Sequence, residues 1–151
     1  MIYKWKTGYH SKIPAKVAGE IMNQLSEEGR LTAKDLVNVS RPEDAPLHKA
    51  FEWNDTEAAE RWREQQGRNL INSIVIQVEG QEHIQPVRAF FIVDQGTSHY
   101  EPVTVIMRNE DMRNKLLTTA KRELAAFRAK YKTLEEFGTL FAEIDRALEV
   151  S

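Results

Sequence analysis

The segment from residue 51 to residue 74 contains a stripe of polar side chains that can hydrogen-bond nucleic acid. The stripe consists of Arg61, Gln65, Arg68 and Asn72. Their spacing of i, i+4, i+7 and i+11 places them on one face of an α-helix, long enough to lie along a groove. Arginine binds guanine edges and phosphates, and glutamine or asparagine binds adenine edges. The stripe therefore predicts contact with double-stranded DNA.

Acidic residues in the same segment favour another interpretation. Four acidic residues accompany three arginines and give the helix a net charge of −1. The acidic residues are Asp55, Glu57, Glu60 and Glu64. Glu64 and Arg68 form an ordinary surface pair at i,i+4, and acids near a helix N-terminus repel phosphate. A solvated face or a protein contact is the alternative to DNA contact.

Two shorter helices are expected before this one. The first, in KIPAKVAGEIMNQLSEEG, has Pro14 in its first turn, Gly29 after its end, and apolar residues every four positions, at Ile13, Val17, Ile21 and Leu25. The second, in LTAKDLVNVS, begins with Thr32 and Asp35 in a variant of the capping box, and its Leu36 and Val37 turn inward.

The third helix is predicted from about Asp55 to Asn72. Asn54 and Glu57 have the spacing of a capping box before it. Opposite the polar stripe, the residues expected to face the core are Ala58, Ala59, Trp62, Leu70 and Ile71. In the connection before it, Leu47, Phe51 and Trp53 form an apolar cluster, and His48 is expected to be packed or hydrogen-bonded.

Three later segments are rich in residues that favour strands. SIVIQVE, VRAFFIVD and HYEPVTVIM are separated by polar or glycine-containing turns and predict a three-stranded antiparallel meander. If one face of the sheet is solvated, Arg88 is expected to point outward from it. The first nine residues resemble a short extended segment that adds a strand or covers the core.

Two helices are expected at the C-terminal end. The first begins at Asn109 and ends near Tyr131, with an apolar face of Leu116, Leu117, Ala120, Leu124 and Phe127. Thr133 and Glu136 have capping-box spacing before the last helix, whose inner face is Leu134, Phe137, Phe141, Ile144 and Leu148.

The predicted fold class is therefore α+β, in a single domain over residues 1–151. Its parts are a helical part (1–73), a β-meander (74–107) and a second helical part (108–151). Three helices followed by a β-hairpin is the order of a winged helix, in which the second and third helices form the helix-turn-helix. The connection from Arg41 to Asn54 is long for such a turn, and the loop GQEHIQ lacks the basic residues of a DNA-contacting wing.

Charge is distributed unevenly although the net charge is only −2 and the pI about 6.1. Residues 108–132 carry eight basic residues against three acids, a balance of +5, and residues 133–151 carry a balance of −4. Complementary solvated faces of two helices are one interpretation. The other is a phosphate-contacting or partner surface on the basic helix, through Arg113, Lys121, Arg122 and Arg128.

No residue pattern predicts an enzyme, a metal site or a cofactor. The chain has no cysteine, its four histidines form no i,i+3 or i,i+4 pair, and nucleotide-binding glycine loops and GxSxG are absent from the sequence. A dispersed carboxylate site, drawing on Glu43, Asp44 or Glu52, is the weakest alternative. No signal-peptide core or membrane-length apolar run is present, so a cytoplasmic protein is expected.

Several segments, taken together, resemble a known group of sequences. APLHKAFEWNDTEAAERWREQQGRNLINSI, PVRAFFIVD and ELAAFRAKY are similar, in order and spacing, to small proteins encoded by tailed phages and prophages of bacteria. The resemblance implies a phage or mobile-element setting within a host bacterial cell. It implies no reaction and carries over no site residue.

Two functions follow as expectations. The first is a non-enzymatic DNA-binding regulator, a monomer or a homodimer, that uses the polar stripe and the basic helix. The second is a protein-interaction module for a host or phage protein, in which the Phe51 and Trp53 cluster or the C-terminal helices hold a partner or a second copy.

Overall fold

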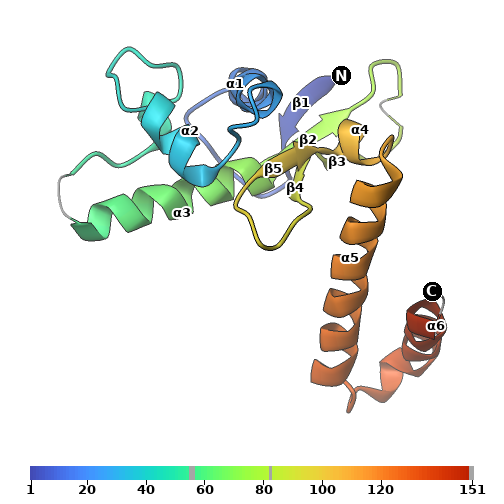
Figure 1. Ribbon diagram of the computed structural model, residues 1–151. Coiled ribbons are helices and arrows are strands. Elements are labelled where there is room, and N and C mark those ends of the chain that lie inside the picture. Colours follow the sequence, from blue (N-terminus) through green and yellow to red (C-terminus); the bar gives the residue numbers. More distant parts are fainter. Residues whose placement is uncertain (55–56, 82, 150–151) are drawn as a thin grey trace. The chain divides into compact units, whose positions relative to one another are not determined.

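The computed structural model describes residues 1–54, 57–81 and 83–149, apart from the side chains of Glu57 and Ala58. The architecture is mixed α+β, as predicted, and the chain divides into two compact units, Met1–Arg108 and Asn109–Ser151 (Figure 1). The predicted capping box of Asn54 with Glu57, and the predicted helix start at Asp55, fall outside the described residues.

The first unit contains two small sheets and most of the helices. Its elements in chain order are β1 (Ile2–Trp5), α1 (Ala15–Glu27), α2 (Ala33–Val39), the 3₁₀ helix η1 (His48–Ala50), α3 (Glu57–Ser73), β2 (Ile74–Gln77), β3 (Val87–Arg88), β4 (Phe90–Ile92), β5 (Tyr100–Pro102) and α4 (Val103–Ile106). The second unit contains α5 (Glu110–Lys130), the 3₁₀ helix η2 (Glu135–Phe137) and α6 (Gly138–Glu149).

The predicted single meander is wrong, because its strands belong to two sheets. β2 lies between β1 and β3 in a three-stranded antiparallel sheet, and β4 pairs with β5 in a second, two-stranded antiparallel sheet. Ala89 is the point of transition: its N–H donates to the Ile74 carbonyl, and its own carbonyl accepts from Val103 N–H. The N-terminal segment supplies the third strand of the first sheet, and the end of HYEPVTVIM forms α4 instead of strand.

The local signals for α1 and α2 are largely confirmed. Gly29 has φ +69, as a left-handed residue after a helix end requires, and the Arg30 N–H donates to the Leu25 carbonyl at 2.8 Å. The Thr32 side chain accepts from the Asp35 N–H and caps α2. Pro14, expected in the first turn of α1, is the residue that precedes it.

The core of the first unit lies among α1, α2, α3 and the sheets. Its buried residues are Ile13, Ala18, Met22, Leu25, Leu31, Leu36, Val37, Leu47, Phe51, Leu70, Ile71, Ile74, Ile76, Ala89, Phe90 and Tyr100. Glycine permits one close approach in it, because a Cβ at Gly19 would lie 2.2 Å from Cγ of Tyr3. The ring of Tyr3 on β1 therefore rests directly on the backbone of α1.

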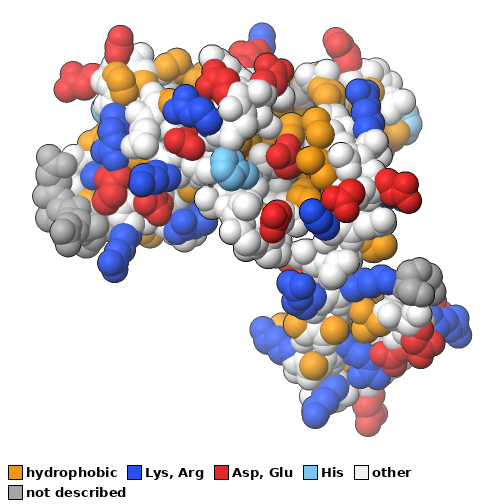
Figure 2. Space-filling view, viewed as in Figure 1, with side chains coloured by type: hydrophobic (Ala, Val, Ile, Leu, Met, Phe, Trp, Pro, Cys, Tyr) orange, Lys and Arg blue, Asp and Glu red, His pale blue; other side chains and the backbone are white. Residues whose placement is uncertain are grey.

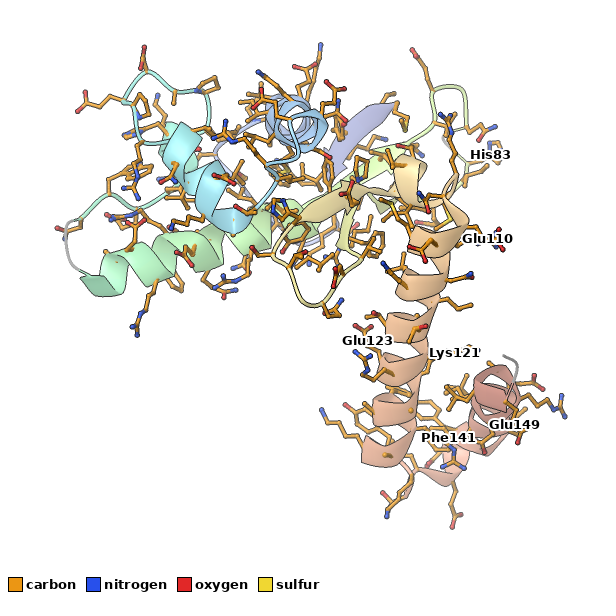
Figure 3. All side chains as sticks on the ribbon, in the orientation of Figure 1. His83, Glu110, Lys121, Glu123, Phe141 and Glu149 are labelled. Carbon is orange, nitrogen blue, oxygen red and sulfur yellow. The ribbon has the colours of Figure 1, made fainter. Side chains whose placement is uncertain are left out.

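The second unit is a helical hairpin with little interior. Asn109 caps α5 through the Met112 N–H, as expected. The predicted capping box of Thr133 with Glu136 is wrong, because η2 begins after Leu134 and makes no side-chain cap. Phe141 points from α6 toward α5 and is buried together with Ile144, whereas Leu134 and Phe137 of the predicted inner face are exposed (Figure 3).

Candidate functional site

The orientation of α3 determines which of its residues are available for binding. Leu70 and Ile71 are buried, as predicted, but Trp62 is 55% exposed, so its predicted core position is wrong. Arg63 takes that place and is 3% exposed. The physical reason is the helical period, since residues three and seven positions before Leu70 share its face, and these are Gly67 and Arg63.

Arg63 is buried because the connection before α3 supplies acceptors for its guanidinium. It donates to the carbonyls of Glu52 and Asn54, at 3.1 and 3.4 Å, and through two nitrogens to Glu60 Oε2. Arg41 also binds Glu60. The hydrogen bonds from Arg63, followed by those from Arg41, hold the pKa of Glu60 below its usual value.

The aromatic cluster of this connection is internal. Phe51 is buried, and Trp53 donates its indole N–H to the His48 carbonyl at 2.7 Å. The His48 ring stacks on Trp53 with 4.8 Å between centroids, and its Nδ1 lies 2.9 Å from the Ser40 carbonyl, so the expectation of a packed, hydrogen-bonded histidine is confirmed. These contacts anchor the connection to the rest of the first unit.

The four predicted stripe residues lie on the outer side of α3. Arg61 and Gln65 are exposed, and Arg68 and Asn72 are half-buried. Arg61 makes no hydrogen bond or ion pair with any residue that the structure describes. Arg68 donates to Gln65 Oε1 at 3.0 Å and lies 3.9 Å from Glu64, while Asn72 accepts from Arg88.

The predicted basic residues of α5 fall into two groups. Arg113 and Arg122 are exposed, and Lys121 is half-buried. Arg128 binds Asp145 of α6 through two nitrogens, at 2.6 and 3.0 Å, and lies over the Phe141 ring. These hydrogen bonds hold the pKa of Arg128 above its usual value, and the residue joins the two helices.

The surface charge is mixed. Figure 2 shows basic and acidic side chains interspersed on the visible face of the first unit, and both basic and acidic side chains around apolar ones on that of the second. No extended single-sign field covers the visible face of the first unit, so any nucleic-acid contact there depends on individual side chains.

A polar pocket beside Trp62 was not predicted from the sequence. Its volume is about 340 Å³, and Lys12, Lys49, Gln66 and Asn69 line it together with Trp62. The signal that could have found it is the phase of α3: once Leu70 and Ile71 are placed in the core, Trp62, Gln66 and Asn69 share an outer face. The contributions of the loops at Lys12 and Lys49 depend on tertiary structure.

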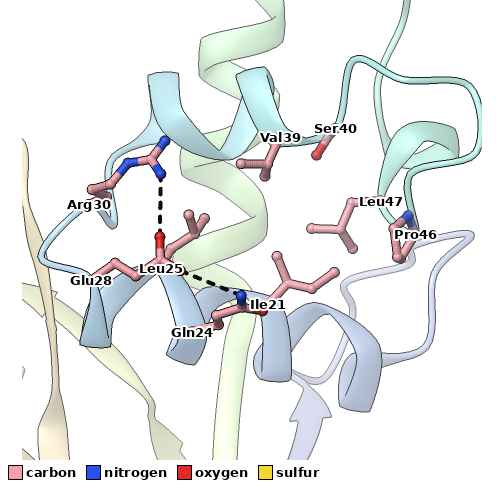
Figure 4. A pocket seen from close by; sticks show the side chains of 9 residues that line it. All are labelled: Ile21, Gln24, Leu25, Glu28, Arg30, Val39, Ser40, Pro46 and Leu47. Carbon is pink, nitrogen blue, oxygen red and sulfur yellow. Dashed lines mark hydrogen bonds and ion pairs between the residues drawn. The ribbon is translucent and has the colours of Figure 1, made fainter.

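A second pocket, of about 380 Å³, lies between α1, the end of α2 and the loop that follows it (Figure 4). Its floor is apolar and includes Ile21, Leu25 and Leu47. On one side Glu28 accepts from Gln24 and Arg30, so the polar groups there are paired with each other.

Metal and membrane features are absent from the described part of the chain. Residues 1–54, 57–81 and 83–149 contain no group of three or more His, Asp or Glu side chains arranged to hold a metal ion. Within the same ranges, no helix combines the length and the apolar character needed to cross a bilayer.

The fold and site define an α+β protein with one unit of helices and two small sheets and a second unit that is a helical hairpin. No protein-family model matches the chain, and no curated protein or solved structure matches it. Functional argument therefore rests on the geometry of the site itself.

Proposed function

We propose that the protein is a non-enzymatic DNA-binding regulator of phage or prophage origin that contacts duplex DNA through the outer face of α3. The observation that carries the proposal is the exposed side of this helix, where Arg61 has no partner among the described residues and stands one turn from Gln65. An unpaired arginine beside an exposed amide suits phosphate and base-edge contact.

The opposite side of α3 is fixed firmly, which supports this assignment. α2 packs along α3 at Gly67, where a Cβ would lie 3.2 Å from the Ala33 carbonyl oxygen. Arg63 holds the preceding connection, and Leu70 and Ile71 are buried. A contact face on an element held in this way is preorganised for binding.

The order of α2, α3 and the β2–β3 pair is also that of a helix-turn-helix followed by a wing. The segment between β2 and β3 contains no lysine or arginine. The proposal therefore assigns the contact to α3 and none to the wing.

The contact set is narrower than the sequence indicates. Asn72 accepts from Arg88 of β3, and Arg128 binds Asp145 of α6, so both are engaged with another element and neither belongs to the proposed contact. Arg68 binds Gln65 and Glu64 of its own helix and is kept. On α3 the set is Arg61, Gln65 and Arg68. On α5 the exposed residues Arg113 and Arg122 are proposed as an additional phosphate-contacting surface.

Anisotropy of a labelled mixed-sequence duplex, at about 50 and 200 mM salt, tests the proposal. We expect Arg61→Ala/Arg68→Ala to weaken binding and to reduce the slope of log affinity against log salt by about 0.9 for each phosphate that the variant no longer neutralises. Lys16→Ala is the matched control, because it removes a charge from α1 at a side chain that is 79% exposed. Unchanged binding in the double variant would overturn the assignment.

The second candidate function, a protein-interaction module, is favoured by the hairpin. Its exposed apolar side chains are Leu117, Leu124, Phe127, Leu134, Phe137 and Leu140, with exposed fractions between 37% and 52%. Such a surface is typical of a contact site. The basic balance of residues 108–132 and the acidic balance of residues 133–151 favour a second copy of the chain, with the acidic helix of each copy against the basic helix of the other.

Sedimentation velocity over a range of protein concentrations tests this second candidate. We expect the native chain to dimerise and Leu117→Glu/Leu124→Glu to sediment as a monomer, because the charges oppose burial of the apolar surface. Thr118→Glu is the control, on an exposed polar position of the same helix. A native chain that stays monomeric throughout would contradict this function.

A further inference from the structure

We infer that the pocket beside Trp62 binds an unpaired base of a single-stranded nucleic acid, with the base stacked on the Trp62 indole and its phosphate bound by Lys12 and Lys49. The inference rests on the proposed nucleic-acid function but uses a different face of α3, about 100° around the helix from Arg61.

Trp62 is the unusual tryptophan of this chain. Trp5 and Trp53 donate their indole N–H groups to the carbonyls of Ile13 and His48, at 2.8 and 2.7 Å, and both stack or tilt against other rings. Trp62 is 55% exposed and makes no ring contact or hydrogen bond with the residues that the structure describes. A large aromatic face left open beside a cavity suits a stacking ligand.

Two lysines also line the pocket. Lys12 follows β1 and Lys49 lies in η1, and both side chains are exposed. Neither forms an ion pair with any described residue, whereas Lys16 on α1 lies 3.8 Å from Glu20. Glu52 is the acid among the lining residues. Two unpaired ammonium groups against one carboxylate favour an anionic ligand.

The amides of Gln66 and Asn69 supply hydrogen-bond donors to the same space. Gln66 Oε1 accepts from the Glu52 N–H at 3.1 Å, and Asn69 Oδ1 accepts from Gln65 Nε2 at 3.0 Å. Both carbonyl oxygens are therefore used, and the NH₂ groups remain to donate. Donors of this kind match the carbonyl oxygens of thymine, uracil or guanine, and match adenine less well.

The base has to be unpaired for a steric reason. In a duplex both faces of a base are covered by its neighbours, so the indole has no free face to stack on. A single strand presents its bases for stacking on aromatic side chains and for hydrogen bonding at their edges. The cavity of about 340 Å³ is open to solvent and polar, in keeping with one base and its phosphate.

The test is anisotropy of a labelled oligothymidylate of about 15 nucleotides, a length within the range of single-strand sites. We expect Trp62→Ala to weaken binding about 5- to 150-fold, the range that follows from the stacking contribution of one base. Trp62→Phe keeps a ring and should retain most of the affinity. Because Trp62 is exposed, both variants should keep the circular dichroism and melting temperature of the native chain.

The two lysines have a separate readout. Lys12→Gln/Lys49→Gln should lower the salt slope by about 0.7 for each phosphate that the variant no longer neutralises, and Lys16→Gln should leave it unchanged. Oligoadenylate should bind more weakly than oligothymidylate. A native salt slope in the lysine double variant, or equal binding of Trp62→Ala and the native chain, would overturn the inference.

Duplex and single-strand binding distinguish this inference from the proposed function. We expect Trp62→Ala to bind the mixed-sequence duplex normally and Arg61→Ala/Arg68→Ala to lose that binding. A protein that binds duplex but not oligothymidylate would overturn only the pocket assignment. One that binds oligothymidylate through Trp62 but not duplex would overturn only the proposed duplex contact. Equal affinity for free thymidine monophosphate would overturn the single-strand assignment.

Discussion

The two units of the chain differ most in how much apolar surface each encloses. The unit Met1–Arg108 buries a continuous core in which Met22, Leu36 and Ile71 are fully inaccessible. Within the described part of the hairpin, Phe141 and Ile144 are the buried hydrophobic residues. The first unit therefore has a self-sufficient core. The hairpin instead depends on aromatic contacts and on the Arg128–Asp145 pair, and its exposed leucines are available to a partner.

The difference also separates two kinds of exposed apolar residue. On α3 the exposed Trp62 stands among polar and basic groups, which suits a small aromatic ligand. On the hairpin the exposed leucines and phenylalanines recur at helical spacing and suit another helix. Exposure alone does not identify a ligand, but the surroundings of the exposed residue do.

The largest effect should come from truncation in the first core. We expect Met22→Ala to lower the free energy of unfolding by about 2–5 kcal/mol, because it leaves a cavity among fully buried side chains. Leu117→Ala on the hairpin, at a side chain that is 52% exposed, should change it by about 0.5 kcal/mol or less in dilute, monomeric protein. Urea denaturation measures both. Equal losses would erase the contrast between the units.

A smaller but substantial loss is expected at Arg63. Arg63→Ala should lower the free energy of unfolding by about 1.5–3 kcal/mol, because it removes charge-assisted hydrogen bonds to Glu60 and to two carbonyls of the connection. Arg61→Ala is the matched control on the same helix and should be nearly neutral. Chemical denaturation that ranks Arg61 above Arg63 would show that the orientation of α3 is incorrect.

The helix caps allow a direct comparison of the units. Thr32→Ala removes the cap of α2, and Asn109→Ala removes the cap of α5. Each substitution should lower the free energy of unfolding by about 1 kcal/mol. If the units unfold separately, each substitution should shift only its own transition. Hydrogen exchange of amides in α2 and α5 would resolve the two effects. A shift in both units from either substitution would indicate one cooperative structure.

The smallest effect concerns pH. The bonds from Arg63 and Arg41 lower the pKa of Glu60, so its contribution to stability is complete above its ordinary pKa of about 4.5 and is lost as pH falls through the lower, folded value. Glu60→Gln should therefore flatten the acid side of the stability profile below about pH 4.5, while leaving its shape near neutrality unchanged. Denaturation midpoints across this range measure the effect. An unchanged acid slope in the variant would contradict it.

The sequence predicted the features that depend on local spacing. The caps at Thr32 and Asn109, the glycine after α1, the inward Leu36 and Val37, and the packed His48 all follow from a few neighbouring residues. These features require only the helical period and the hydrogen-bonding capacity of short polar side chains.

The errors arose where tertiary contacts override local preference. Trp62 is predicted to face the core because it is assigned to the side of the helix opposite the polar stripe, but Arg63 occupies the core face, where the carbonyls of Glu52 and Asn54 accept its donors. VRAFFIVD reads as one strand, yet Ala89 divides it between two sheets. The α3 side of the Trp62 pocket follows from the helical period, but Lys12 and Lys49 are distant in sequence, so no local pattern could place them there.

The contact of Tyr3 with Gly19 has a consequence for how the chain folds during synthesis. β1 is synthesised well before its sheet partner β2, and Ile2 pairs with Gln77. Until β2 leaves the ribosome, the Tyr3 ring can pack on the α1 backbone but β1 has no strand to pair with. Pairing β1 with β2 closes a long loop, and the entropy cost of closing it opposes early formation of the sheet. We expect α1 and α2 to form first, as an intermediate whose apolar faces are partly exposed. The rest of the first unit should then form in one late step, once β2 is available.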